Sequence, residues 1–123
     1  MGNRRVLIVD DEPDVVESIT FRLELENIEC LAARDGAEGL RIAQEELPDL
    51  IILDVMMPKI TGYKVARALK QDERCRHIPI ILLTARSQAG DRMLGVDSGA
   101  NDYMTKPFDL DGLTGKVLKY LGK

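Results

Sequence analysis

The sequence predicts an α/β protein, a three-layer α/β/α sandwich in which helices cover both faces of a parallel five-stranded sheet. Short apolar runs alternate five times with longer amphipathic segments along the chain. Three of the runs, VLIV, LIIL and IPIILL, are continuously apolar, which is typical of strands buried on both faces. Alternation of this kind favours one mostly parallel sheet with right-handed crossovers.

Five short segments are expected to form the strands of this sheet. They are residues 5–9, 29–33, 50–53, 78–83 and 102–104. The last of them has the weakest strand pattern.

Five amphipathic segments follow the strands and are expected to be helices. They are residues 13–27, a segment that starts at Asp35-Gly36 and ends before Pro48, and residues 63–69, 88–97 and 110–121. Pro13 suits the first turn of a helix, where its missing amide hydrogen costs nothing. Gly90 and Gly95 each cost a helix interior about 1 kcal/mol relative to Ala. We therefore expect the fourth helix to be the least stable and the easiest to move.

The composition narrows the class of protein. The 123 residues are long enough for one domain with its own core, residues 1–123. A net charge of -4 and an aromatic content of 4% argue against direct nucleic-acid binding, which needs a basic face with stacking residues. No apolar run approaches the roughly 20 residues of a membrane span, and no signal peptide is recognisable. We expect a cytoplasmic protein that does not bind a membrane, with Cys30 and Cys75 as reduced thiols.

Polar residues stand where the predicted strands end. Asp10 and Asp11 follow the first strand, Asp54 the third, Thr84 the fourth and Lys106 the fifth. In open parallel sheets the ligand site lies at the carboxyl ends of the strands, where the strand order reverses. These five side chains are therefore expected to form one site.

The chemistry of these residue types indicates a metal-assisted phosphoryl site. Three carboxylates in one pocket raise one another's pKa and destabilise the fold unless a cation joins them. Hard oxygen ligands without His or Cys favour Mg²⁺, with Mn²⁺ as an alternative ion. Lys106 offers a point charge to a phosphoryl oxygen, and Thr84 offers a hydroxyl donor. Asp54 is then the candidate nucleophile, since carboxylates are known covalent nucleophiles toward phosphoryl groups.

Four motifs of the chain resemble those of a known family. The motifs VDDE, ILDVMMPKITGYKV, IILLTA and DYMTKPF occur in order and span essentially the whole sequence. Together they resemble the receiver domains of two-component response regulators, which are CheY-like. The resemblance implies a flavodoxin-like sheet of strand order 2-1-3-4-5.

The resemblance also implies a role for each acid. Asp54 would be the phosphoacceptor, forming an aspartyl phosphate. Asp11 would bind Mg²⁺ directly and Asp10 largely through water, while Asp54 and the backbone carbonyl of Met56 would complete the protein ligands.

Further roles follow from the same resemblance. Thr84 would be the switch hydroxyl that moves toward the phosphoryl group, and Tyr103 would be the switch aromatic residue that turns inward with it. Lys106 would bridge to the phosphoryl group. The bond from Lys106 to Pro107 would be a cis peptide, a form that is affordable before proline.

The function implied is a phosphorylation-controlled signalling module. The donor would be a histidine kinase or phosphotransfer protein, and the output a change of the surface formed by the fourth helix, fifth strand and fifth helix. That surface would control a downstream protein or a linked effector domain, with a phosphorylation-dependent dimer as one form of output. Kinase choice would lie on residues 13–21 and 106–108. Such a domain is not an enzyme in the usual sense, because it catalyses only its own phosphorylation and slow self-dephosphorylation.

Three alternatives stay open to different degrees. A receiver-like module could signal by protein contact without phosphorylation. An aspartyl-phosphate phosphatase of the haloacid dehalogenase type needs a second acid two residues after the nucleophile, where this chain has Met56. A dinucleotide-binding module needs a glycine-rich first turn, where this chain has Asp-Asp-Glu-Pro at residues 10–13.

Overall fold

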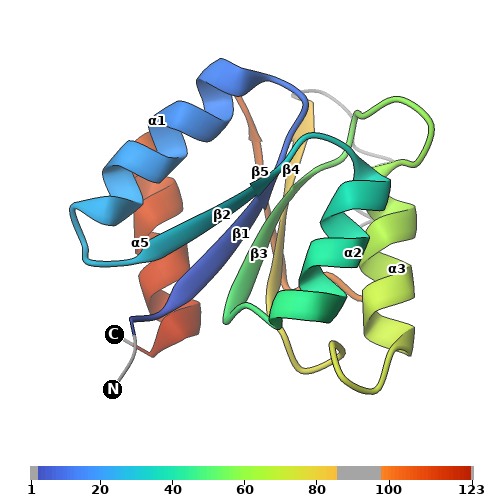
Figure 1. Ribbon diagram of the computed structural model, residues 1–123. Helices are drawn as coiled ribbons and strands as arrows, with labels where there is room; N and C mark the ends of the chain where they lie inside the picture. The colour runs from blue at the N-terminus through green and yellow to red at the C-terminus, as the bar shows by residue number, and fades with distance from the viewer. Residues whose placement is uncertain (1–2, 86–97, 123) are drawn as a thin grey trace.

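One sheet of five parallel strands organises the chain (Figure 1). The computed structural model describes residues 3–85 and 98–122. The strands are β1 (Arg5–Val9), β2 (Glu29–Ala33), β3 (Leu50–Asp54), β4 (Ile80–Ala85) and β5 (Asp102–Lys106). Their order in the sheet is β2-β1-β3-β4-β5, and every neighbouring pair is parallel. The predicted flavodoxin-like order is confirmed.

Helices cover both faces of the sheet. They are α1 (Pro13–Glu24), α2 (Gly36–Glu46), α3 (Gly62–Gln71) and α5 (Leu110–Leu121). Helices α1 and α5 lie on one face, and α2 and α3 lie on the other (Figure 1). The described residues thus contain four helices where five were predicted, and the predicted helix at 88–97 lies outside the described residues. No described helix is long and apolar enough to cross a membrane.

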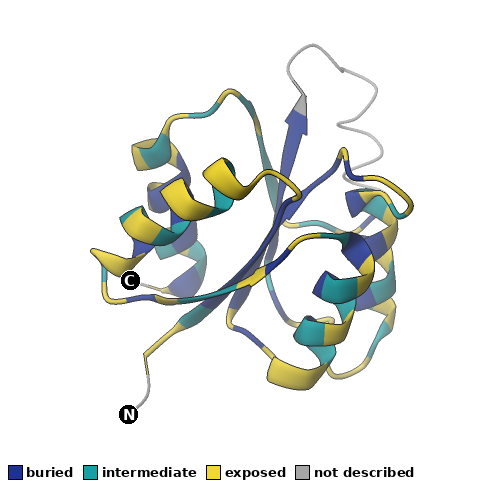
Figure 2. Cartoon of the chain, turned by 45° about the horizontal axis from the view of Figure 1, so that its top comes forward, coloured by how far each residue is buried: buried dark blue, intermediate teal, exposed yellow. Residues whose placement is uncertain are grey.

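The two-residue period of the strands divides the core in two. On β1, Leu7 and Val9 pack with α2 and α3, while Val6 and Ile8 pack with α1 and α5. The strands β1, β3 and β4 form the buried centre of the molecule (Figure 2). This two-sided burial explains why the apolar runs are continuous, and it confirms the three-layer sandwich.

Strand β4 begins two residues later than predicted. Pro79 has no amide hydrogen to give to a strand ladder. The amide of Ile78 instead donates to the carbonyl of Cys75 at 2.9 Å, and the Lys70 ammonium donates to the Ile78 carbonyl at 2.8 Å. The prediction of a strand from residue 78 was therefore wrong, because these bonds hold Ile78 in the preceding loop.

Strands β4 and β5 both extend past their predicted ends. Thr84 pairs with Thr105, and Ala85 pairs with Lys106. As a result, Thr84 lies one residue before the end of β4, and Lys106 is the last residue of β5. Hydrogen bonding between β4 and β5 extends both strands beyond the residues that the apolar pattern predicts.

Helix α1 ends at Glu24, three residues before the predicted end. Asn27 has a φ of 63°, which lies in the left-handed region and cannot continue a helix. The amide of Asn27 donates back to the Glu24 carbonyl at 3.0 Å, and the amide of Ile28 donates to Leu23 at 3.2 Å. The chain thus closes a tight turn after α1 and enters β2.

Candidate functional site

The carboxyl ends of three strands bring polar side chains together at one edge of the sheet. Asp10 follows β1, Asp54 ends β3 and Lys106 ends β5. Strand β1 lies between β2 and β3, so the strand order reverses beside Asp10, as the rule for ligand sites in open α/β sheets requires. Asp10 is 0% exposed and Asp54 is 3% exposed. The site is thus built on two buried carboxylates.

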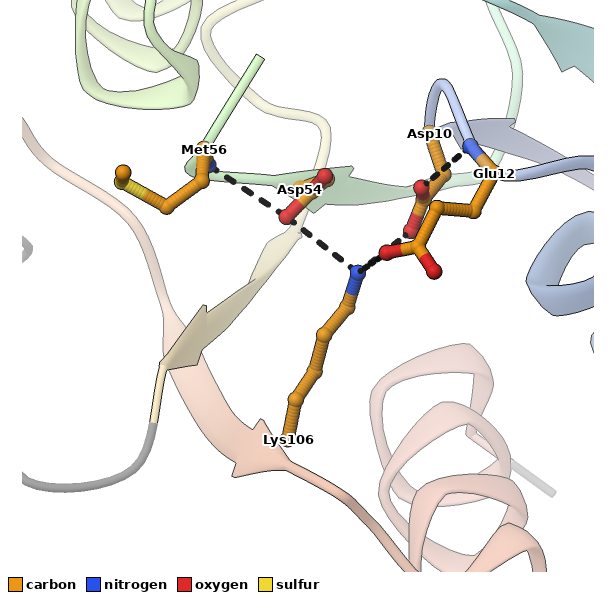
Figure 3. Close-up of polar contacts among 5 residues, drawn as sticks. All are labelled: Asp10, Glu12, Asp54, Met56 and Lys106. Atoms are coloured by element: carbon orange, nitrogen blue, oxygen red, sulfur yellow. Dashed lines mark hydrogen bonds and ion pairs between the residues drawn. The ribbon is translucent and has the colours of Figure 1, made fainter.

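The ammonium of Lys106 lies among three carboxylates (Figure 3). Its Nζ donates to Asp10 Oδ2 at 3.0 Å and to Glu12 Oε1 at 3.1 Å. The distance from Nζ to Asp54 Oδ1 is 3.5 Å. One cation therefore partly offsets the repulsion among the acids.

Burial and a neighbouring charge raise the pKa of the Asp54 carboxyl group. Burial is the largest cause that raises the pKa of its carboxyl group, and the charge of Asp10 raises it further, to about 6. Lys106 and the amide of Met56, which donates to Asp54 Oδ1 at 3.3 Å, act in the opposite direction. At neutral pH the carboxylate is charged but poorly solvated, a state suited to attack on an electrophile.

Lys106 stays charged in this setting. Burial alone would lower the pKa of its ammonium. The hydrogen bond to Asp10 and the charges of Asp54 and Asp10 act against burial, so the pKa lies above its usual value. Lys106 therefore brings a positive charge to the two buried carboxylates.

Three consecutive acids can hold a cation. One carboxylate oxygen from each of Asp10, Asp11 and Glu12 lies within 4.8 Å of the others, and we call these three residues the acid group. An all-oxygen donor set of this kind fits Mg²⁺. Asp54 is not a member of this group, which was identified among the described residues. Two of the four predicted metal ligands, Asp10 and Asp11, belong to the acid group, and Glu12 is its third member.

The remaining predicted residues lie around this centre. Met56 is two residues beyond Asp54, and its amide rather than its carbonyl contacts the Asp54 side chain. Thr84 is 7% exposed and makes no hydrogen bond to Asp54 or Lys106 in the described part of the chain. Tyr103 is half-buried and packs beside the core cluster below α2 and α3. The peptide bond from Lys106 to Pro107 is cis.

Glycine 62 is a site residue that sequence reasoning missed. It packs directly on the main chain of Asp54, the candidate phosphoacceptor. A Cβ at Gly62 would clash with the Asp54 carbonyl oxygen and would lie 2.9 Å from the Cα of Val55. The amide of Gly62 donates to the Val55 carbonyl at 3.0 Å. Only glycine allows this close approach, which fixes where Asp54 lies at the end of β3.

Glu12 was the second omission. Sequence reasoning assigned roles to Asp10 and Asp11, and Glu12 entered only as part of the motif VDDE. Its contact with Lys106 joins residues 94 positions apart. The run of three acids after a buried strand was the available signal, but it does not say which acid faces the lysine.

Comparison with known proteins gives one consistent family. Residues 6–118 match the family model for the response regulator receiver domain. The chain is 42% identical over 113 residues to the DNA-binding dual master transcriptional regulator RpaA of Synechocystis sp., a match that covers 92% of this chain and 47% of that protein. It is 47% identical over 105 residues to the response regulator PleD of Caulobacter vibrioides, covering 85% of this chain and 23% of that protein. The chain thus spans about half or less of the length of these curated relatives.

A solved structure agrees in fold. The receiver domain of the sensor histidine kinase PA1611 from Pseudomonas aeruginosa superposes with a TM-score of 0.86 at 30% sequence identity. The superposition covers 99% of this chain and 100% of that chain. That structure has a magnesium ion coordinated in its active site cleft.

Proposed function

The chain belongs to the response regulator receiver domain family, and from that membership we propose that it is a phosphorylation-controlled signalling receiver whose phosphoacceptor is Asp54. Receiver domains are signalling domains of two-component systems. The residues 1–123 act as one such domain in the cytoplasm. The observation that carries the proposal is the buried Asp54 carboxylate, 3.5 Å from the Lys106 ammonium and beside the acid group.

The phosphoryl transfer follows from these positions. An oxygen of the Asp54 carboxylate attacks the phosphorus of the donor, and a bond from oxygen to phosphorus forms. The bond from phosphorus to the donor nitrogen or oxygen breaks, and the leaving group keeps the electron pair. The ammonium of Lys106 holds a phosphoryl oxygen and offsets its charge. The product is an acyl phosphate on Asp54.

The acid group supports the metal part of the proposal. Asp10 and Asp11, with Asp54 and the carbonyl of Met56, would hold Mg²⁺, and Glu12 lies close enough to join them. When bound, the ion supplies positive charge that stabilises the transferring phosphoryl group.

A groove beside the site supports a protein donor. It has a volume of about 500 Å³ and lies between α1 and the turn after β5. Its lining residues are Glu12, Asp14, Val15, Ser18, Lys106, Pro107 and Phe108. Phe21, further along α1, is 67% exposed. A histidine kinase or phosphotransfer protein that docks here would present its phosphohistidine next to Lys106.

The output is proposed to pass through Thr84 and Tyr103. Both lie on the strand pair β4 and β5, where Leu82 pairs with Tyr103 and Thr84 pairs with Thr105. A phosphoryl group on Asp54 would draw the Thr84 hydroxyl, and Tyr103 would follow inward. The altered surface of β5 and α5, with the segment before β5, would then bind a downstream protein, a linked effector domain or a second phosphorylated copy.

Incubation with Mg²⁺ and acetyl phosphate, followed by measurement of the intact mass, tests the proposal. We expect a gain of one phosphoryl group in the unchanged chain. The Asp54→Asn variant and a sample with EDTA serve as controls, and neither should gain mass. If the unchanged chain gains nothing and also fails to bind beryllofluoride, the chain is a receiver-like module that acts without phosphorylation.

A further inference from the structure

The Lys106 ammonium is held more closely by two acids than by the phosphoacceptor. Its contacts with Asp10 and Glu12, at 3.0 and 3.1 Å, are hydrogen bonds. Its contact with Asp54 is longer, at 3.5 Å. In this arrangement the ammonium lies between the acid group and Asp54, and its shortest contacts are with the acid group (Figure 3).

Glu12 stands out among these acids. It occupies the N-cap of α1 with an extended backbone, yet its side chain makes no capping hydrogen bond. Its amide donates to Asp10 Oδ1 at 2.9 Å, which fixes its backbone beside Asp10. Its side chain is 62% exposed and reaches the ammonium of Lys106. The Glu12 carboxylate thus pairs with a lysine from β5 and does not cap its own helix.

The same carboxylate can also face a cation. Glu12 contributes one of the three oxygens of the acid group, which lie within 4.8 Å of one another. A divalent cation placed there would attract Glu12 and repel the ammonium of Lys106, since like charges at such distances oppose each other. Lys106 and the cation therefore compete for Glu12.

We propose that Glu12 is a positioning residue that holds Lys106 at the acid group until a divalent cation takes the place of the ammonium there. The inference rests on the proposed function for the roles of the cation and of Lys106. Release of Lys106 from Glu12 then leaves the ammonium free to hold a phosphoryl oxygen on Asp54. Glu12 thereby makes the availability of the lysine depend on the cation.

A double-mutant cycle on Mg²⁺ affinity tests this coupling. Isothermal titration calorimetry gives the Mg²⁺ dissociation constant of four chains: unchanged, Glu12→Gln, Lys106→Gln and the double variant. With Lys106 present, Glu12→Gln removes a ligand of the cation but also removes the Glu12–Lys106 ion pair that the cation would have to break, so its two effects on Mg²⁺ affinity partly cancel. In the Lys106→Gln background there is no such pair, so Glu12→Gln only removes the ligand. We expect Glu12→Gln to weaken Mg²⁺ binding at least about threefold more in the Lys106→Gln background.

Glu17→Gln is the matched control for the cycle. Glu17 is exposed on α1, and this change removes the same charge near the site from a residue that has no ion pair to Lys106 in the described chain. Its effect on Mg²⁺ affinity should be equal in both lysine backgrounds. If the effect of Glu17→Gln on Mg²⁺ affinity also differs between the two lysine backgrounds, the coupling arises from the loss of any nearby negative charge. That result would overturn the inference.

The ¹⁵N signal of the Lys106 ammonium gives a second readout, which a merely structural role of Glu12 would not move. The signal is identified by its absence from Lys106→Gln. We expect it to shift when Mg²⁺ is added to the unchanged chain, and to shift in Glu12→Gln before any cation is added. Glu17→Gln should leave it in place.

Three results would each overturn the inference. They are an equal effect of Glu12→Gln in both lysine backgrounds, an unmoved Lys106 signal in Glu12→Gln, and the absence of Mg²⁺ binding by the unchanged chain. Phosphorylation of Asp54 is measured separately, by mass on the unchanged chain. A chain that gains the phosphoryl group but shows no coupling refutes the role of Glu12 and leaves the proposed function standing.

Discussion

At the scale of single residues, Asp54 carries a stability cost that its chemistry explains. A buried carboxylate beside Asp10 prefers to be protonated, and its pKa of about 6 lies above the ordinary value of 3.8. The unfolded chain would release this proton near the ordinary value. Between about pH 4 and pH 6 the folded chain therefore binds more protons than the unfolded chain, and stability falls as the pH rises through this window.

Replacement of Asp54 by Asn should remove that cost. In metal-free buffer at neutral pH, we expect Asp54→Asn to be more stable than the unchanged chain by about 1–2 kcal/mol. Below about pH 4 the Asp54 carboxyl group is protonated in both the folded and the unfolded chain, so the stability advantage of Asp54→Asn should vanish. Urea unfolding across a pH series measures it.

The control for Asp54→Asn is Asp14→Asn, which alters an exposed residue in the first turn of α1. This variant should gain no stability at neutral pH. Equal stability of Asp54→Asn and the unchanged chain, or a difference that does not vary with pH, would contradict the proposed environment of Asp54.

Sequence reasoning located much of this centre but not all of it. The ends of the apolar runs predicted that Asp10, Asp54 and Lys106 meet, because parallel strands end at one edge of a sheet. The structure confirms that meeting. Glu12 could not be assigned, since the side chain that reaches Lys106 depends on how the chain turns into α1. The phosphoacceptor, metal and switch roles stay predictions.

At the scale of elements, the loop from β3 to α3 fixes the position of Asp54. Thr61 caps α3 by accepting a hydrogen bond from the Lys64 amide at 3.3 Å, so the first turn of the helix starts beside β3. Gly62 then packs against the main chain of Asp54 and Val55. This contact ties the start of α3 to the proposed phosphoacceptor.

We expect Gly62→Ala to destabilise the chain by about 2–3 kcal/mol, because the added methyl group must displace the backbone of β3. The same displacement should slow phosphorylation of the folded fraction by acetyl phosphate. Urea unfolding and the time course of mass gain measure the two effects.

Gly115→Ala is the matched control for Gly62→Ala. Gly115 lies exposed within α5, and a Cβ there would meet nothing within 4 Å. This change should stabilise the helix by about 0.5–1 kcal/mol. If the two substitutions change the free energy of unfolding alike, the contact with Asp54 does not restrict position 62 to glycine.

Element boundaries show where local sequence patterns lose their power. Residues 5–9 and 29–33 were predicted with the bounds that the structure has. Strand β4 was placed too early because an apolar pattern does not reveal that the Ile78 amide bonds to Cys75. The role of Gly62 could not be predicted for a related reason, since a close approach between loop and strand depends on the path of the chain in space.

At the scale of the whole molecule, the three-layer architecture joins the proposed phosphorylation site to two surfaces. The carboxyl edge of the sheet holds the acids and Lys106, the groove beside α1 is the proposed donor surface, and β5 leads from Lys106 to α5. The fold class and strand order could be predicted from the sequence because five alternating segments and four family motifs agreed. The predicted fourth helix, at residues 88–97, lies outside the described residues, so that part of the output surface stays a prediction.

The measurement that tests the central claim most directly is the position of the phosphoryl group on the chain. After incubation with acetyl phosphate and Mg²⁺, borohydride reduces an aspartyl phosphate to homoserine, and mass spectrometry of the peptides locates that residue. We predict homoserine at position 54 alone. Homoserine at position 10 or 11 with Asp54 intact would contradict the assignment of Asp54 as the phosphoacceptor.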